Sequence, residues 1–155
     1  MRITTYRTRL TADKRVALEK EISVNRPDID SIIRSPENVA EIAKGYLRMH
    51  EEPEEYMYMI CMNTKNKIIG VFEISHGNVN SSIVGTREVF QKALLANAVS
   101  IILMHNHPSG DCTPSREDVE VTKRIAEAGK ILGVQLLDHI IVGDTYTSLK
   151  EKGYI

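Results

Sequence analysis

The chain has 155 residues, of which 42% are hydrophobic and 26% charged, with a net charge of -1 and an isoelectric point near 6.5. This length suits one globular domain with one core, the charge gives no overall basic field for nucleic acid, and no apolar run reaches the ~18 residues of a membrane span. The start "MRITTYRTRL" has no signal-peptide apolar region and two cysteines need no disulfide framework, so we expect a cytoplasmic protein without a membrane segment.

The charge distribution sets the N-terminal segment apart from the rest. Residues 1–34 carry three more Lys and Arg than Asp and Glu, whereas residues 35–155 carry four fewer. We therefore expect residues 1–34 to be an N-terminal extension of unknown role and residues 35–155 to form the functional domain.

The first half of that domain predicts a helix followed by a hairpin. Ser35 and Pro36 make a helix start, and apolar residues then recur at helical spacing until "EEPEE" (51–55). The stretch "YMYMICM" (56–62) is apolar on both alternating faces, as in a strand that is covered on both sides. The turn "NTKN" leads to a second strand, "KIIGVFEIS" (67–75).

The second half predicts two more helices and three strands. A helix from about residue 86 to 97 precedes a short buried strand, "VSIILM" (99–104). Another helix begins near Ser115 and ends at Gly133, which can cap it, and strands follow at 134–142 and 146–149. The order of elements indicates an α/β fold with a mixed β-sheet flanked by helices.

The stretch "MHNHPSGDCTPSRED" (104–118) concentrates side chains that can bind a metal or take part in catalysis. Strand side chains alternate, so His105 and His107 point the same way if the extended backbone persists beyond the buried strand. A hydrolytic zinc site typically uses three protein ligands and leaves a fourth position to water. Asp118, on the first turn of the next helix, is the best placed carboxylate for the third ligand.

Each of these residues also has a simpler interpretation. Ser115 and Asp118 stand where a helix N-cap and its third residue belong, so the pair could serve only to cap the helix. An H-x-H pair at a strand end is often just polar loop. Cys112 is a bystander in our interpretation, because a thiolate would be a fourth protein ligand and would close the site. His76 and His139 are expected to be hydrogen-bonded structural residues.

The combined spacing resembles a known family. "HNHPSGDCTPSRED" resembles the JAMM signature of the JAB/MPN metalloproteases, and "TREVFQKALLANAVSIILMHNHPSG" and "VTKRIAEAGKILGVQLLDHIIVGD" are similar to its RadC branch. The resemblance runs from about residue 35 to 155 and implies the JAB/MPN (cytidine deaminase-like) architecture. Residues 1–34 are too short for the helix-hairpin-helix module of full-length RadC proteins, so we expect none there, and the historical link to DNA repair has little support.

The resemblance also implies roles for individual residues. By position, it implies zinc ligands at His105, His107 and Asp118. It implies Ser115 as the group that helps to hold the oxyanion, and Glu73, four positions before the glycine of "EISHGNVNS", as the acid/base residue. Glu88 and Glu54 are weaker candidates for that role, because one lies on a helix and the other in a charge run.

Together these features predict a JAMM-type zinc metallopeptidase. It would hydrolyse a peptide or isopeptide amide bond, with Zn²⁺ as cofactor and a peptide or protein as substrate. The alternatives are a zinc-dependent hydrolase or nuclease that acts on DNA, which the charge does not support, and a non-catalytic MPN scaffold. A (β/α)₈ amidohydrolase needs ~250 residues. Zinc deaminases need a C-x-x-C motif that this sequence lacks.

Overall fold

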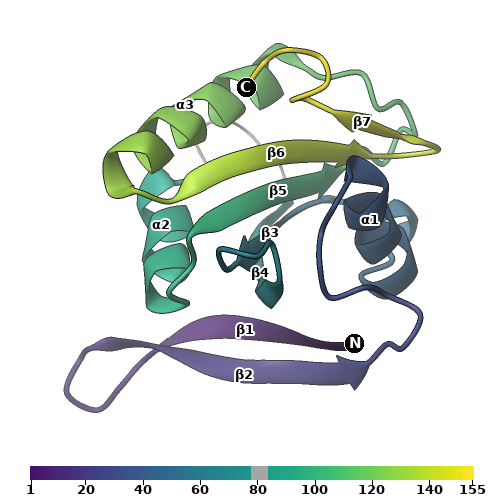
Figure 1. Ribbon diagram of the computed structural model, residues 1–155. Helices are drawn as coiled ribbons and strands as arrows, with labels where there is room; N and C mark the ends of the chain where they lie inside the picture. The colour runs from purple at the N-terminus through teal and green to yellow at the C-terminus, as the bar shows by residue number, and fades with distance from the viewer. Residues whose placement is uncertain (78–83) are drawn as a thin grey trace.

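One mixed sheet organises the structure, a computed structural model that describes residues 1–77 and 84–155 (Figure 1). Among these residues, the sheet has seven strands: in sheet order, β2 (Val16–Asn25), β1 (Arg2–Leu10), β4 (Ile68–Gly77), β3 (Glu55–Met62), β5 (Ser100–Asn106), β6 (Gln135–Val142) and β7 (Tyr146–Ser148). The pairs β1/β4 and β5/β6 are parallel, and the other neighbours are antiparallel. The expected α/β class with a mixed sheet is confirmed.

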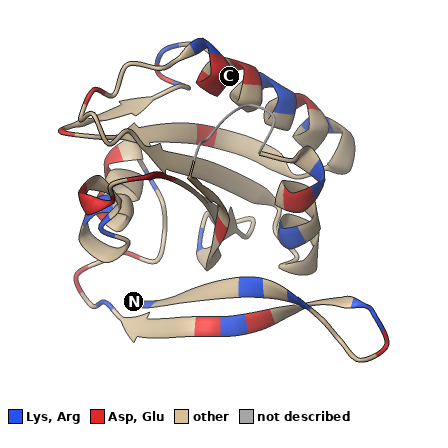
Figure 2. Ribbon diagram, turned by 180° about the vertical axis from the view of Figure 1, so that it is seen from behind, with Lys and Arg blue, Asp and Glu red and all other residues tan. Residues whose placement is uncertain are grey.

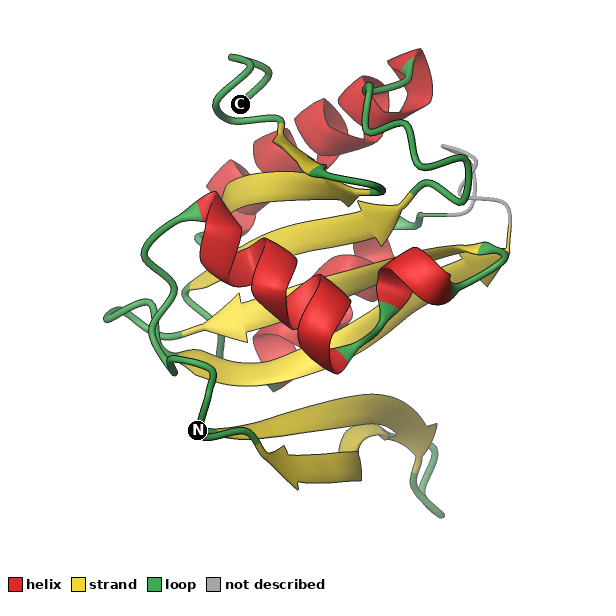
Figure 3. Cartoon of the chain, turned by 90° about the vertical axis from the view of Figure 1, so that its right-hand side faces the viewer, coloured by secondary structure: helices red, strands yellow, loops and turns green. Residues whose placement is uncertain are grey.

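Helices cover both faces of this sheet. One face carries α1 (Pro36–Glu41), the π-helical turn η1 (Ile42–Tyr46) and the 3-10 turn η2 (Met49–Glu51), and the other face carries α2 (Thr86–Leu95) and α3 (Arg116–Leu132). Figure 3 shows the α1 side in front of the sheet and the other helices behind it. Over the described part of the chain, no helix has the length and apolarity that a membrane crossing requires.

Alternation along the central strands separates the core into two layers. Met57 and Leu103 pack beneath α2 and α3, whereas Ile60 and Ile102 pack beneath α1 and η1. Because both faces of β5 are covered, all seven of its residues are buried, which explains the unbroken apolar run in its sequence. Residues 104–118, which carry the two histidines and Asp118, therefore begin within a strand that is buried on both faces.

The β3/β4 hairpin is confirmed, and its ladder contains an irregularity that matters for the site. Met57 pairs with Ser75, but the next residue, Tyr58, pairs with Glu73. Ile74 is therefore an extra residue on β4, as in a β-bulge. The bulge changes which residues of β4 share a face with β3.

The N-terminal segment is part of the same sheet. β1 and β2 form a hairpin, and β1 pairs in parallel with β4 through Thr5 and Tyr6. Ile3 is fully buried, and the ring of Tyr6 stacks on that of Phe72 at 5.5 Å between centroids. Figure 2 shows basic and acidic residues side by side on this hairpin. Residues 1–34 therefore contribute two strands to the sheet of the rest of the chain, and the boundary at residue 34 stays a prediction.

Candidate metal centre

The end of β5 presents two histidines toward the same side. His105 lies within the strand, and the backbone N–H of His107 donates to the carbonyl of Val142 at 2.8 Å, which extends the strand-like path by one more pair. A turn follows immediately, because Pro108 fixes its own φ and Gly110 adopts a φ of +83°. The Gly110 N–H closes this turn on the carbonyl of His107 at 3.0 Å.

Three donor atoms converge at this point. His105 Nε2 lies 3.0 Å from His107 Nε2 and 3.1 Å from Asp118 Oδ1, and His107 Nε2 lies 3.4 Å from Asp118 Oδ2. A tetrahedral ion with ligands at 2.0 to 2.1 Å separates its ligand atoms by about 3.3 Å. The three distances, two of which end on different oxygens of Asp118, are close to this separation, so the three residues could hold a metal ion. No other described residues form such a His, Cys and carboxylate group.

The first turn of α3 places Asp118 at the cluster. Ser115 is the N-cap, and its Oγ accepts from the Asp118 N–H at 3.1 Å. Asp118 Oδ2 in turn accepts from the Ser115 N–H at 2.8 Å and from the Ser115 hydroxyl at 2.6 Å. The capping interpretation is thus confirmed, and it is compatible with a ligand role, because Asp118 Oδ1 faces His105.

Charge at the cluster is concentrated and largely buried. Burial opposes ionisation of Asp118, but the favourable interactions of its carboxylate with His105, His107 and Ser115 outweigh burial and hold the pKa of Asp118 well below its usual value. The hydrogen bond to Asp118 raises the pKa of His107. His105 and Asp118 are nearly inaccessible, whereas the His107 side chain is 15% exposed. Solvent therefore reaches the cluster on the His107 side.

The second nitrogen of each ring is also engaged. His107 Nδ1 donates to the backbone carbonyl of Asp111 at 2.7 Å, so the lone pair of a neutral His107 ring lies on Nε2. His105 Nδ1 lies 2.8 Å from Nε2 of His139, which is fully buried and, as expected, structural. Burial and the neighbouring His105 hold the pKa of His139 well below its usual value. Such outer partners orient metal-binding histidines.

The structure does not bring Glu73 to this cluster. Glu73 pairs with Tyr58, whereas His105 lies opposite Met57, the adjacent residue of β3. Adjacent strand residues point to opposite faces, so Glu73 lies on the face away from His105. Its Oε1 is 2.8 Å from Nδ1 of His76, an exposed ring that stacks on Tyr56. In the structure, the Glu73 carboxylate contacts His76 and not the three clustered residues, and its assignment as the acid/base residue stays a prediction.

A different glutamate, which the sequence analysis overlooked, shares the face of the histidines. Glu55 lies two residues before Met57 on β3, so continuing the ladder with β5 by one step on that face places it opposite His107. The negative charge of Glu55 also contributes to the raised pKa of His107, after Asp118 and the Asp111 carbonyl. The residue pairing of β3 and β5 is the signal that identifies it.

Asn106, between the two histidines, fixes the backbone on both sides of Glu55. Its side chain is buried, its Oδ1 accepts from the N–H of Tyr56 at 2.7 Å, and its Nδ2 donates to the carbonyl of Glu54 at 2.9 Å. The middle residue of the H-x-H pair therefore ties the start of β3 to the end of β5. Glu55 is held beside the cluster by the same residue that separates the two histidines.

The remaining candidates lie outside the cluster. Cys112 is buried with its Sγ 3.7 Å from the carbonyl of Gly110, so it does not complete the ligand set. Glu88 folds back on Gly85, before α2. Glu54 contributes its backbone carbonyl to Asn106.

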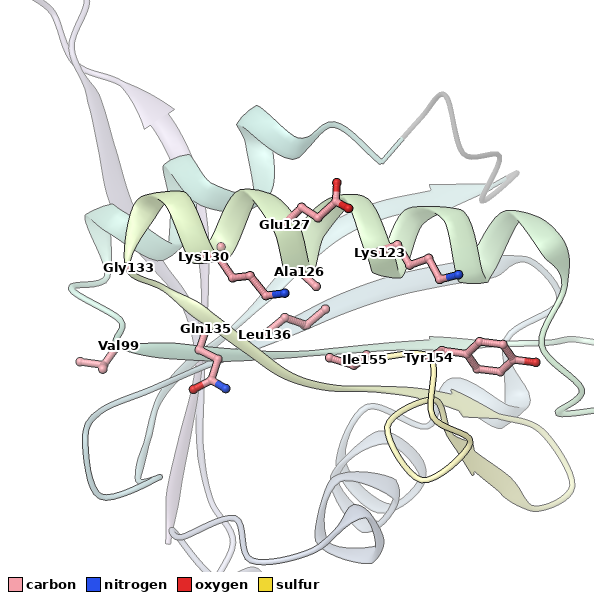
Figure 4. Close-up of a pocket in the computed structure, with 11 residues that line it drawn as sticks. Val99, Lys123, Ala126, Glu127, Lys130, Gly133, Gln135, Leu136, Tyr154 and Ile155 are labelled. Atoms are coloured by element: carbon pink, nitrogen blue, oxygen red, sulfur yellow. The ribbon is translucent and has the colours of Figure 1, made fainter.

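A groove of about 660 Å³ lies at the other end of α3, among residues such as Lys130 and Leu136 (Figure 4). Its lining also includes Tyr154 and Ile155 near the C-terminus. Asp118 lies on the first turn of α3 and Lys130 on the last, so this groove is separate from the metal centre.

Comparison with known proteins identifies the family of this chain. Relatives include UPF0758 proteins of Geobacillus sp. (strain WCH70), 52% identical over 80% of this chain and 54% of the relative, and of Caldanaerobacter subterraneus, 49% identical over 90% and 59%. A UPF0758 protein of Desulfitobacterium hafniense is 41% identical over 99% of this chain and 69% of its own length. The chain thus spans little more than half the length of the first two. A family model described as RadC-like JAB domain matches residues 33–154, which include His105, His107 and Asp118, and the chain therefore belongs to this family.

Proposed function

We propose that this chain is a zinc-dependent hydrolase that cleaves a peptide or isopeptide amide bond with an activated water molecule. The observation that carries the proposal is the convergence of His105 Nε2, His107 Nε2 and the Asp118 carboxylate: the two nitrogens lie 3.0 Å apart, His105 Nε2 lies 3.1 Å from Oδ1 and His107 Nε2 lies 3.4 Å from Oδ2. Membership in the JAB family also supports a metal-dependent hydrolase. Three protein ligands leave one tetrahedral position for the reacting molecules.

The donor set favours zinc over the hard cations. Two imidazole nitrogens and one carboxylate are typical zinc ligands, whereas Ca²⁺ and Mg²⁺ prefer shells made of oxygen. A zinc ion in this position would lower the pKa of water to about 7 and stabilise negative charge on the carbonyl oxygen of the substrate.

Glu55 is the proton carrier that the geometry supports best. It shares the face of the histidines, and Asn106 holds the backbone on both sides of it. In the proposed reaction, its carboxylate takes the proton from the attacking water and returns it to the nitrogen of the leaving amine, so that the amide C–N bond breaks without charge left on the amine. The acid/base role of Glu73, which the family resemblance implied, becomes the competing assignment.

Ser115 has a role that depends on where its hydroxyl proton points. In the structure, this hydroxyl donates to Asp118 Oδ2 at 2.6 Å and so helps to orient a ligand. To stabilise an oxyanion, it would have to donate to the substrate instead. Orientation of Asp118 is therefore its primary role in our proposal.

The charge around the opening favours an amide over a phosphodiester. The charges of Glu55 and Asp111 lie near the partly exposed His107, and the whole chain has a net charge of -1. A DNA backbone would meet repulsion here, since nucleic-acid affinity depends chiefly on neutralising phosphates. A neutral peptide bond meets no such repulsion.

The test is metal analysis combined with a substrate panel. We expect about one zinc ion per chain in the purified protein, and hydrolysis of at least one peptide or isopeptide that stops with a chelator and returns with zinc. His107→Ala should lose both zinc and activity. Cleavage of DNA but of no peptide would establish the nuclease alternative. Zinc binding with no hydrolysis of either class would support the scaffold alternative, and absence of zinc binding would overturn the proposal.

A further inference from the structure

A buried chain of hydrogen bonds leads from the candidate metal centre into the core. His105 Nδ1 lies 2.8 Å from His139 Nε2, and His139 Nδ1 lies 2.6 Å from the hydroxyl of Thr122. That hydroxyl lies 2.6 Å from the backbone carbonyl of Asp118, to which it donates. His105, His139 and Thr122 are 1% exposed or less, so water does not compete for these bonds.

The direction of each proton follows from counting donors. Thr122 has one hydroxyl proton, and the carbonyl of Asp118, four residues earlier on α3, takes it. The hydroxyl oxygen must then accept from His139, so the proton of the neutral His139 ring lies on Nδ1. His139 Nε2 is left as an acceptor and receives the proton of His105 Nδ1. The lone pair of His105 consequently lies on Nε2, which faces His107 and Asp118.

We infer that Thr122 and His139 are positioning residues that fix the tautomer of His105 and thereby make its Nε2 available to the metal. This inference rests on the proposed metal site. The outer partner of a metal-binding histidine is usually a carboxylate, a backbone carbonyl or water. Here the partner of His107 is such a carbonyl, whereas His105 depends on a second imidazole that is itself oriented by a threonine.

A neutral imidazole can carry its proton on either ring nitrogen, so the hydrogen bonds of this chain could run in either of two directions. If Thr122 donated to His139 instead, every proton in the chain would reverse, and His105 would present Nε2–H to Asp118. The bond from Thr122 to the Asp118 carbonyl is what selects one direction over the other. Both ends of the chain therefore terminate on Asp118: one at its backbone, the other at its carboxylate.

The first measurement is the tautomeric state of the histidines in the wild-type chain. Long-range ¹H–¹⁵N NMR spectra distinguish Nδ1–H from Nε2–H rings. We expect His105 and His139 to carry their protons on Nδ1, both before and after zinc is added. An Nε2–H tautomer of His105 in the zinc-free protein, or zinc coordination through its Nδ1, would overturn the inference even if zinc binds.

The second measurement compares matched variants at Thr122. Thr122→Val keeps the shape but removes the hydroxyl, so we expect a mixture of His105 tautomers in the zinc-free protein and zinc affinity reduced by about 10- to 100-fold. Thr122→Ser keeps the hydroxyl and should restore both properties. A Thr122→Val variant with wild-type affinity and one His105 tautomer would contradict the inference.

A parallel pair at His139 separates hydrogen bonding from packing. His139→Gln can offer its amide oxygen to His105 Nδ1, whereas His139→Leu fills the space without an acceptor. We expect the glutamine variant to bind zinc more tightly than the leucine variant. Equal affinities would show that His139 acts through packing alone and would overturn its assigned role. If the wild-type chain binds no zinc, the proposed function fails first, and this inference falls with it.

Discussion

Strand register decides which glutamate of the β3/β4 hairpin shares a face with His105 and His107. Ile74 is the extra residue on β4, because Met57 pairs with Ser75 while Tyr58 pairs with Glu73. Glu73 consequently contacts His76 on the opposite face from His105. Glu55 shares the face of His105 and His107, and no irregularity lies between it and Met57.

The two glutamates give opposite predictions for the same substitution. Glu55→Gln should lower the hydrolysis rate by about 10²- to 10⁴-fold while leaving zinc bound, because glutamine keeps the shape but cannot accept the proton of water. Glu73→Gln is the matched control and should retain the rate, because its side chain lies on the other face. Rates and zinc content are measured together for each variant. Loss of activity in the Glu73 variant alone would return the acid/base role to that residue.

At this scale, the sequence predicts residues that are close together in the chain and misses those brought together by strand pairing. His105, His107 and Asp118 lie within 14 residues, so a strand end, a turn and a helix start are enough to predict their convergence. Glu55 lies about 50 residues earlier and becomes visible only from the register of β3 against β5. The sequence also fails to identify Thr122 and His139, because each resembles an ordinary core residue.

At the scale of elements, the loop between β5 and α3 is held by close backbone contacts with the β6–β7 turn. The N–H of Asp144 donates to the carbonyl of Gly110 at 2.9 Å, and a Cβ on Gly143 would come within 2.3 Å of that same oxygen. Only glycine fits at residue 143 without a shift of this loop. The helices and strands from residue 55 onward were predicted to within a few residues by periodicity, whereas β1 and β2 were not predicted. Contacts between loops leave no periodic pattern.

Gly143→Ala should therefore weaken zinc binding without touching a ligand. The added methyl group must displace the turn that follows His107, and a small displacement of one ligand lowers metal affinity. We expect a zinc dissociation constant at least several-fold higher by chelator competition. Gly45→Ala is the control, since its Cβ would meet only the end of Arg26 at 3.5 Å. Equal affinities of the two variants would show that the loop absorbs the change.

A contact between α1 and β7 predicts a pH-dependent contribution to stability. Hydrogen bonds from Ser35 and Tyr146 lower the pKa of Glu37 from 4.5 to about 2. A lowered pKa stabilises the fold above the unfolded-state value and loses that effect as the pH falls from about 4.5 toward 2. Tyr146→Phe should therefore be less stable than the wild type in urea unfolding at pH 7, and the difference should shrink below pH 4. A difference that is constant with pH would mean that the tyrosine acts through packing.

At the scale of the whole molecule, the N-terminal hairpin extends the sheet of the family domain. The family model begins at residue 33, yet Ile3 of β1 lies in the same core layer as Ile102 of β5. The sequence analysis separated this segment by its charge, and charge describes the exposed surface of a hairpin more than its attachment. The parallel pairing of β1 with β4 connects residues about 65 positions apart, which no local pattern reveals.

Ile3→Ala should show that this attachment stabilises the domain. Ile3 is fully buried, and truncation of such a side chain typically lowers the free energy of unfolding by about 2 to 5 kcal/mol. Ile22→Ala, on the exposed part of β2, is the control and should change it by about 0.5 kcal/mol or less. Urea unfolding followed by circular dichroism measures both. Equal stabilities of the two variants would mean that the hairpin is only loosely attached.

Because Asp118 both caps α3 and belongs to the candidate metal centre, a bound ion would be coupled to the local opening of α3. The carboxylate that faces His105 also closes the first turn of α3 through Ser115, so that turn cannot fray while the carboxylate is held by a metal. Amide protons near Ser115 and Asp118 should then exchange with deuterium more slowly in the zinc-loaded protein, whereas those near Leu132 should exchange as before. A bound ion would keep the first turn of α3 closed, and release of the ion would begin with the unwinding of that turn.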